Sequence, residues 1–339
     1  MEHIKSLILR ITERCNLACD YCYAACHNCK NTDMSVETAL KAVALCCPEN
    51  GGLRIQFTGG EPLLNIGVME AVFNYGKATN RKLILSVQTN GTLLTPEICR
   101  RLAAMKCAVG VSLDGIREAN SLRHFPDGTP AQSHVIDGIR NLGQLGIRCN
   151  LTTVVTSANA AMLGQLPDLA LWLGNVRGVG LDLFRPLGRG ASQHLVPDEA
   201  ALQTGLTALI RKTKEIQAAG VPFRLREMER LKKRCPAECS SQFYCYAQTE
   251  QSICIDSAGD CWPCSSLAGN AGFYLGNIRE GIPENQPCRP ELLAPEKCKS
   301  CPFFSICIGG CPAGRVGRNG TADPMTCMMT KTLLKEMGR

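Results

Sequence analysis

The sequence lacks any apolar run long enough to span a membrane, because no stretch approaches the roughly eighteen uncharged apolar residues that a span needs. The opening segment, MEHIKSLILRIT, also lacks the long apolar region and small-residue cleavage site of a secretion signal. These two absences exclude membrane-spanning and classically secreted proteins. The sequence therefore predicts a cytoplasmic protein with no membrane partner.

The sequence also lacks a basic stripe interleaved with aromatic side chains. Aromatic residues make up only 5% of the chain, and the lysines and arginines that give a formal net charge of +7 are scattered along it. A nucleic-acid-binding surface typically gathers its basic residues on one face. We therefore expect no nucleic-acid partner and interpret the positive charge as a solvated surface, offset in part by any bound anionic cluster.

Cysteine, in contrast, is abundant, with 22 residues in a chain of 339. Thiols stay reduced in the cytoplasm, so these cysteines indicate metal ligands before they indicate a disulfide framework. Five of them fall within CNLACDYCYAACHNC, residues 15–29. Disulfides, zinc and an iron-sulfur cluster could each account for that stretch on its own.

Short apolar runs alternate with stretches of helical spacing through the first two thirds of the chain. The expected strands are residues 6–12, 53–59, 82–90, 108–115, 148–156 and 178–186. The expected helices are residues 35–47, 66–79, 95–105, 133–146, 160–174 and 198–220. This alternation predicts an α/β fold, a parallel sheet wrapped by helices in a partial (β/α)6 TIM-like barrel.

The composition changes after about residue 230, where regular periodicity fades and Gly and Pro become frequent. Twelve of the 22 cysteines lie between Cys235 and Cys327. A segment this poor in apolar periodicity can gain stability from bound metal, since ligation is coupled to folding. We predict a barrel domain over residues 1–230 and an irregular Cys-rich domain over residues 231–339.

Cys15, Cys19 and Cys22 stand in the loop after the first expected strand, at the end of the barrel where active sites assemble. Three thiolates can hold three irons of a 4Fe-4S cluster and leave the fourth iron open to an external ligand. A structural zinc site would need a fourth ligand, which Cys26 or Cys29 could supply.

The triplet, followed in order by FTGGEPLLN, SVQTNGTLL and VGVSLDG, resembles the radical S-adenosylmethionine (radical SAM) superfamily over about residues 5–190. The resemblance implies that the three cysteines bind a 4Fe-4S cluster whose fourth iron binds S-adenosylmethionine (SAM). It also implies that Tyr21 lies near the adenine and that Glu61 meets the methionine ammonium. The residues that it places at SAM are Tyr21, Thr58, Gly59, Gly60, Glu61, Pro62, Gln88, Asn90 and Ser112.

The C-terminal cysteines resemble the SPASM extension of radical SAM enzymes that modify peptides and proteins. That resemblance implies two auxiliary 4Fe-4S clusters, and so three clusters in all. The first would use Cys239, Cys245, Cys264 and Cys311. The second would use Cys298, Cys301, Cys307 and Cys327. If all eight cysteines act as ligands, neither auxiliary cluster has an open iron, which favours electron transfer as their role.

Together these features predict a radical SAM enzyme, an oxidoreductase that acts as a peptide or protein maturase. It would cleave SAM reductively to a 5′-deoxyadenosyl radical, which abstracts a hydrogen atom from the substrate. The expected partners are the peptide or protein substrate, a flavodoxin- or ferredoxin-type reductant, and a separate leader-peptide-binding protein unless recognition is leader-independent. The first strand begins by residue 6, so we expect no preceding leader-binding domain.

Two alternatives remain open. The cysteine plan is shared by anaerobic sulfatase-maturating enzymes, which form formylglycine and commonly carry Asp after the cysteine that corresponds to Cys264; here Ser265 occupies that position. A non-enzymatic iron-sulfur electron carrier is the second alternative, although it has no need of a SAM pocket. Among the remaining cysteines, we expect small core residues at Cys46, Cys47, Cys99, Cys107 and Cys149. No catalytic acid, base or hydrogen donor is assigned.

Overall fold

The computed structural model describes residues 4–26, 32–192, 194–234, 243–281, 290–316, 318 and 320–338. Four of the 22 cysteines lie outside these ranges: Cys29, Cys235, Cys239 and Cys288. Of these, Cys239 is a predicted cluster ligand.

The barrel strands follow one another in space as they do in sequence, each parallel to the next. Each is a run of alternating or fully buried apolar residues, as a sheet covered by helices requires. They are β1 (Ser6–Arg10), β2 (Gly52–Thr58), β3 (Lys82–Thr89), β4 (Ala108–Ser112), β5 (Cys149–Val155) and β6 (Val176–Leu183), followed by the short β7 (Arg224–Leu225). The predicted α/β barrel architecture is confirmed.

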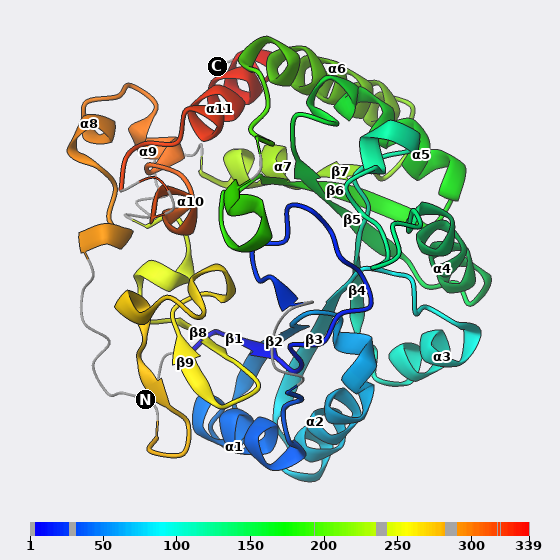
Figure 1. Ribbon diagram of the computed structural model, residues 1–339, viewed down its shortest axis with the longest axis vertical. Helices are drawn as coiled ribbons and strands as arrows, with labels where there is room; N and C mark the ends of the chain where they lie inside the picture. Colours follow the sequence, from blue (N-terminus) through cyan, green and yellow to red (C-terminus); the bar gives the residue numbers. More distant parts are fainter. Residues whose placement is uncertain are drawn as a thin grey trace.

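Helices cover the outer face of the curved sheet, and the loop after β1 crosses its inside (Figure 1). Ser35, Thr95 and Asp198 cap the first turns of α1, α3 and α6 by accepting hydrogen bonds from backbone N–H groups. The helices are α1 (Val36–Cys46), α2 (Ile66–Ala78), α3 (Pro96–Ala104), α4 (Gln132–Gln144), α5 (Leu166–Leu173) and α6 (Glu199–Ala218).

The predicted helix over residues 160–174 is in fact two pieces. A 3-10 helix, Ala160–Gln165, precedes α5, which begins at Leu166. Pro167 lies in the first turn of α5, where its missing N–H costs nothing, so the chain starts a new helix there.

The C-terminal segment extends the same sheet. Strand β8 (Ser252–Ile255) pairs in parallel with β1, and β9 (Asp260–Trp262) and β10 (Gly276–Asn277) follow in antiparallel pairing. The result is a ten-stranded sheet in the order β10-β9-β8-β1-β2-β3-β4-β5-β6-β7. The sequence predicted irregular structure here, whereas the segment contributes three strands to the sheet. The domain boundary near residue 230 stays a prediction.

Short helices complete the C-terminal segment, and the last of them packs against α6 (Figure 1). They are α7 (Arg226–Arg234), α8 (Glu296–Lys299), α9 (Phe304–Cys307), α10 (Pro312–Val316) and α11 (Pro324–Glu336). Within the described ranges, no helix has both the length and the apolar character needed to cross a bilayer.

The main hydrophobic core lies between the sheet and its helices. Cys46, Cys47, Cys99, Cys107 and Cys149 are buried in it, as predicted. A second, smaller core around Trp262 and Phe273 supports the C-terminal segment. Polar and thiol side chains line a cavity at the carboxyl ends of the parallel strands.

Candidate active site

A cavity of about 280 Å³ opens at the carboxyl ends of the barrel strands; we call it the thiol cavity. It contains all three thiols of the N-terminal triplet, Cys15, Cys19 and Cys22. Seven of the nine residues predicted to contact SAM also line it: Tyr21, Thr58, Gly59, Gly60, Gln88, Asn90 and Ser112. Motifs that are far apart in sequence therefore meet at one place.

The three triplet thiols differ in their affinity for a proton. Burial raises the pKa of Cys15 to about 12 and also raises the pKa of Cys19, so both thiols hold their protons at neutral pH unless a metal replaces them, whereas a hydrogen bond with the Cys26 thiol lowers the pKa of Cys22. Among the described residues, no three His, Cys, Asp or Glu side chains close around a single metal ion. The three thiols share one cavity, where they could hold three irons of a cluster.

Cys26, the described candidate for a fourth zinc ligand, hydrogen-bonds the Cys22 thiol of the triplet and also contacts two charged side chains. Arg10 Nη2 lies 3.9 Å from its sulfur, and the thiol donates to Glu13 Oε2 at 3.7 Å. Arg10 and Glu13 form an ion pair at 2.5 Å beneath the loop. Cys26 thus lies against a buried ion pair at the edge of the thiol cavity, and no zinc site forms among the described residues.

The two glycines of the GGEP motif let the loop after β2 pack directly on the cysteine loop. A Cβ at Gly59, whose φ is +143°, would lie 2.2 Å from the Thr12 carbonyl oxygen. A Cβ at Gly60 would lie 2.1 Å from the Arg14 carbonyl oxygen and 3.0 Å from Cys15 Cβ. The family resemblance places both glycines at SAM. The structure shows that their close backbone contacts also set the position of Cys15.

Gly60→Ala is therefore expected to displace the cysteine loop, because backbone atoms rather than a flexible side chain obstruct the new methyl group. We expect a loss of about 1–3 kcal/mol in the free energy of unfolding and a reduced iron content after reconstitution. Gly67→Ala is the matched control, since no atom lies within 4 Å of its Cβ position and alanine favours helix α2. Denaturant unfolding and iron analysis of both variants measure the difference; equal behaviour would contradict the prediction.

Glu61 has a set of partners that the sequence did not predict. Its side chain is 0% exposed, and its carboxylate accepts hydrogen bonds from the Thr89 hydroxyl at 2.7 Å and the Asn90 backbone N–H at 2.7 Å. It also caps the turn that begins at Pro62 by accepting from Leu63 N–H. Neither Glu61 nor Pro62 lines the thiol cavity. Contact of Glu61 with the methionine ammonium stays a prediction.

Polar side chains at the ends of β3, β4 and β5 are linked by hydrogen bonds. Gln88 Nε2 donates to Ser112 Oγ at 3.0 Å and Gln88 Oε1 accepts from Thr152 Oγ1 at 3.2 Å. Asn90 donates to the Asn16 side-chain oxygen at 2.8 Å, which ties the QTNG segment to the cysteine loop. These bonds fix polar groups of the cavity wall before any ligand arrives.

Arg123 and Asp114 hold the Tyr21 hydroxyl, and neither residue was predicted from the sequence. Tyr21 donates to Asp114, and Arg123 Nη1 donates to the Tyr21 oxygen at 2.6 Å. Arg123 is only 5% exposed, lines the thiol cavity and has a buried Nε without a hydrogen-bond partner. No motif marks Arg123, although Asp114 belongs to the SLDG segment that was used for Ser112 alone.

The C-terminal segment contributes a side chain to the thiol cavity. Ser265, which follows Cys264, lies in the cavity wall with its hydroxyl 3.1 Å from the Tyr23 hydroxyl. Burial raises the pKa of Tyr23 to about 12, so this phenol stays protonated at neutral pH. The position therefore presents two neutral hydroxyl groups and no carboxylate.

The described C-terminal thiols interact electrostatically within each of the two ligand sets that the resemblance implies. Cys245, Cys264 and Cys311 lie close enough to influence one another electrostatically. The same holds for the second group, in which Cys298 and Cys327 both lie near Cys307, and Cys298 also lies near Cys301. Cys239, the fourth predicted ligand of the first group, lies outside the described residues. The roles of these thiols stay predictions.

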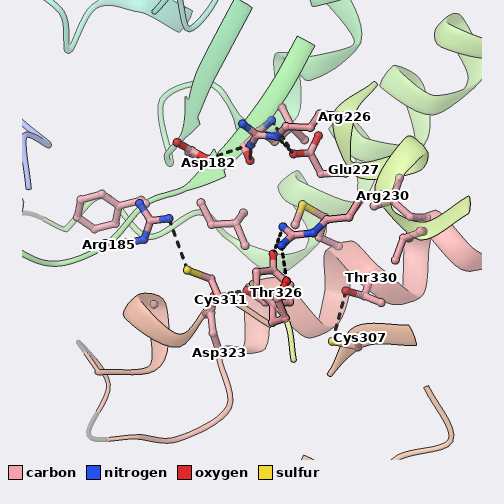
Figure 2. A pocket seen from close by; sticks show the side chains of 18 of the residues that line it. Asp182, Arg185, Arg226, Glu227, Arg230, Cys307, Cys311, Asp323, Thr326 and Thr330 are labelled. Atoms are coloured by element: carbon pink, nitrogen blue, oxygen red, sulfur yellow. Dashed lines mark hydrogen bonds and ion pairs between the residues drawn. The ribbon is translucent and has the colours of Figure 1, made fainter. Parts of the chain in front are cut away.

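A second cavity, of about 300 Å³, lies between β6, α7, α10 and α11; we call it the arginine cavity (Figure 2). Arg185, Arg226, Arg230 and Arg234 line it together with Cys307 and Cys311. Arg226 binds Asp182 and Glu227, each at 2.9 Å. Asp182, Leu183, Arg185 and Arg226 line the thiol cavity as well, so the two cavities share a wall.

A parallel barrel with three cysteine thiols in a cavity at its carboxyl end defines an α/β-barrel protein that could hold a metal cluster there. Residues 9–168 match the family model of the radical SAM superfamily. The chain belongs to this superfamily, whose members are enzymes that bind a 4Fe-4S cluster and SAM.

Similar sequences carry several functions. An uncharacterised protein of Methanocaldococcus jannaschii is 30% identical over 83% of this chain and 91% of its own length. An AdoMet-dependent heme synthase of Nitratidesulfovibrio vulgaris is 27% identical, covering 93% of this chain and 89% of its own. The mycofactocin maturase MftC of Mycobacterium ulcerans is 27% identical, covering 91% and 83%.

Solved structures share the fold over nearly the whole chain. The enzyme anSMEcpe with bound AdoMet superposes with a TM-score of 0.83 at 23% identity, covering 99% of this chain and 97% of its own. SuiB of Streptococcus suis, bound to its precursor peptide SuiA, gives 0.70 at 17% identity, covering 96% and 76%. The C-terminal thiols of this chain thus lie in a segment whose fold these two proteins share.

Proposed function

We propose that the chain is a radical SAM maturase that modifies a peptide or protein. The observation that carries the proposal is the thiol cavity, which brings the Cys15, Cys19 and Cys22 thiols together with the SAM motifs. Ser265 places the C-terminal segment in the wall of the same cavity, so a substrate there would touch both halves of the chain. The similarity to SuiB and to the mycofactocin maturase supports a peptide substrate.

Each half of the chain has residues for a distinct task. The triplet would hold the SAM-binding cluster, and Gln88, Asn90 and Ser112 would orient SAM beside it. Cys239, Cys245, Cys264 and Cys311, and Cys298, Cys301, Cys307 and Cys327, would hold two auxiliary clusters. When bound, the clusters and SAM supply reductive cleavage, the 5′-deoxyadenosyl radical and an electron acceptor. The protein itself excludes water and fixes the substrate carbon against the radical.

The test is anaerobic reconstitution of the full chain with iron and sulfide, followed by reduction with dithionite in the presence of SAM. We expect about 12 irons per chain and release of 5′-deoxyadenosine, measured by chromatography and mass spectrometry. About four irons with stoichiometric zinc would remove the auxiliary clusters from the proposal. No 5′-deoxyadenosine would favour an electron carrier. Peptides encoded by neighbouring reading frames are the substrates to try first.

Formylglycine formation is the second candidate, because the C-terminal cysteine plan resembles that of anaerobic sulfatase-maturating enzymes. A positioned base contributes typically 10²- to 10⁴-fold to removal of the substrate proton. The Ser265 hydroxyl and its Tyr23 partner are both neutral at pH 7, so neither accepts that proton readily. Asp182 also lines the thiol cavity, but its carboxylate is paired with Arg226 at 2.9 Å, so the geometry favours a different maturation reaction.

A sulfatase-derived peptide with Cys or Ser at the target position is accordingly expected to be turned over slowly or not at all. Mass spectrometry after anaerobic incubation with SAM and reductant is the measurement. Ser265→Asp is the matched variant, and we expect it to fold. A loss of about 18 Da from the Cys peptide or of about 2 Da from the Ser peptide, with an aldehyde trapped by a hydrazine, would establish formylglycine formation instead.

A further inference from the structure

Arg185 lies in the wall shared by the two cavities, just beyond the carboxyl end of β6. Its guanidinium Nη2 is 3.9 Å from the Cys311 sulfur, and Figure 2 shows the side chain pointing at that thiol. Cys264 lies close enough for its charge to act on the same guanidinium. Arg185 is thus directed at the first group of C-terminal thiols.

The other arginines of the arginine cavity have oxygen acceptors. Arg226 is neutralised by Asp182 and Glu227, each at 2.9 Å. Arg230 and Arg234 both donate to the Tyr244 backbone carbonyl, and Arg230 also stacks on the Tyr244 ring. Among the described residues, the Arg185 guanidinium makes no ion pair within 4.0 Å and has the Cys311 sulfur as its hydrogen-bond partner. The Asp182 carboxylate also acts on this guanidinium, but Arg226 pairs with that carboxylate at 2.9 Å, so the Arg185 charge remains available to an anionic group at those thiols.

The loop that carries Arg185 also packs against the N-terminal triplet. A Cβ at Gly188 would lie 2.5 Å from the Cys22 carbonyl oxygen, and Arg189 Nε donates to the Cys19 carbonyl at 3.0 Å. The same loop therefore contacts the triplet at one end and Cys311 at the other. The position of Arg185 is fixed relative to both groups of thiols.

We propose that Arg185 is a positioning residue that raises the reduction potential of the first auxiliary cluster. The inference rests on the proposed function, in which the described thiols Cys245, Cys264 and Cys311 are ligands of that cluster. A 4Fe-4S cluster with four thiolates carries a net charge of about −2, and gaining an electron makes it about −3. A fixed cation beside a ligand sulfur stabilises the more negative state more strongly, so it favours reduction.

The test is a redox titration followed by electron paramagnetic resonance, performed on the full chain with Cys15, Cys19 and Cys22 replaced by alanine. That background removes the SAM-binding cluster and leaves the signals of the two auxiliary clusters. Arg185→Gln is expected to lower the equilibrium constant for one-electron reduction of one cluster by at least about tenfold, which is about 59 mV. Arg185→Lys keeps the charge and should stay near the parent value.

Two references accompany the titration. The second auxiliary cluster should keep its potential in every variant, since Arg185 contacts none of its described ligands. Arg177→Gln removes a charge from the opposite end of β6, where the guanidinium donates to the Gly174 carbonyl, and should change neither potential.

Unchanged potentials in Arg185→Gln with full auxiliary iron would overturn this inference and leave the proposed function standing. A parent chain without auxiliary iron would overturn the proposed function itself. If Arg185→Gln loses about four irons while Arg185→Lys retains them, the charge is needed to retain that cluster rather than to set its potential, and the inference fails. If both variants lose them, side-chain geometry rather than charge is responsible, and the inference fails.

Discussion

Replacing Cys15, Cys19 and Cys22 together with alanine is expected to abolish SAM cleavage and to remove about a third of the bound iron. The three thiols line the thiol cavity beside the SAM motifs, and no other thiol triplet among the described residues shares that position. Cleavage requires an electron delivered to SAM at this site, so its loss should be complete. The measurements are 5′-deoxyadenosine release and iron content of the reconstituted chain.

The barrel should survive this change, because the main core lies between the sheet and the helices and does not depend on the triplet for most of its contacts. Far-ultraviolet circular dichroism should therefore stay nearly native. The matched control replaces Cys99, Cys107 and Cys149, three buried thiols that line neither described cavity, and should keep iron and cleavage. Residual cleavage in the triplet variant at the level of the control would contradict the assignment.

Cys307→Ala is expected to separate the two halves of the chain. Cys307 lines the arginine cavity, accepts a hydrogen bond from Thr330 Oγ1 at 3.8 Å and does not line the thiol cavity (Figure 2). The variant should lose about four of about 12 irons and keep SAM cleavage. Once a substrate is identified, its modification should fall by about 10²-fold or more, because the electron released in product formation loses its path.

Complete loss of cleavage in a soluble, folded Cys307→Ala protein would contradict this division of roles. Misfolding is distinguished by circular dichroism and by SAM binding, since metal ligation stabilises the C-terminal segment. Cys254→Ala provides the control, because this buried thiol belongs to the small core of that segment and lines neither described cavity. It should retain all the iron.

The sequence predicted the barrel well because each strand has a recognisable local sequence pattern. Residues 82–90 and 148–156, for example, were predicted within one residue of β3 and β5, since β-branched runs bounded by polar turns have few other solutions. The helix at residues 160–174 was predicted too long, because the break at Pro167 depends on where the first helical turn starts.

Pairings between distant segments were harder to predict. The short SICI run of β8 carries no signal for its partner, and only the assembled sheet shows that it lies beside β1. The same holds for Arg123 and Arg185, which no motif marks and whose positions depend on loops. For Glu61, no signal in the sequence predicted the hydrogen bonds that its carboxylate accepts from Leu63 N–H, Asn90 N–H and the Thr89 hydroxyl, and its contact with SAM stays a prediction.

The pairing of β8 with β1 also has a consequence for the time course of synthesis. Ile255 at the end of β8 follows Arg10 at the end of β1 by 245 residues. At about 5–20 residues per second, the ribosome needs on the order of 10 to 50 seconds to make that stretch. Throughout this interval one edge of β1 has no strand to cover it, and an uncovered edge is a template for aggregation. The sheet of the nascent barrel therefore lacks β8 at the edge of β1 until the C-terminal segment has been made.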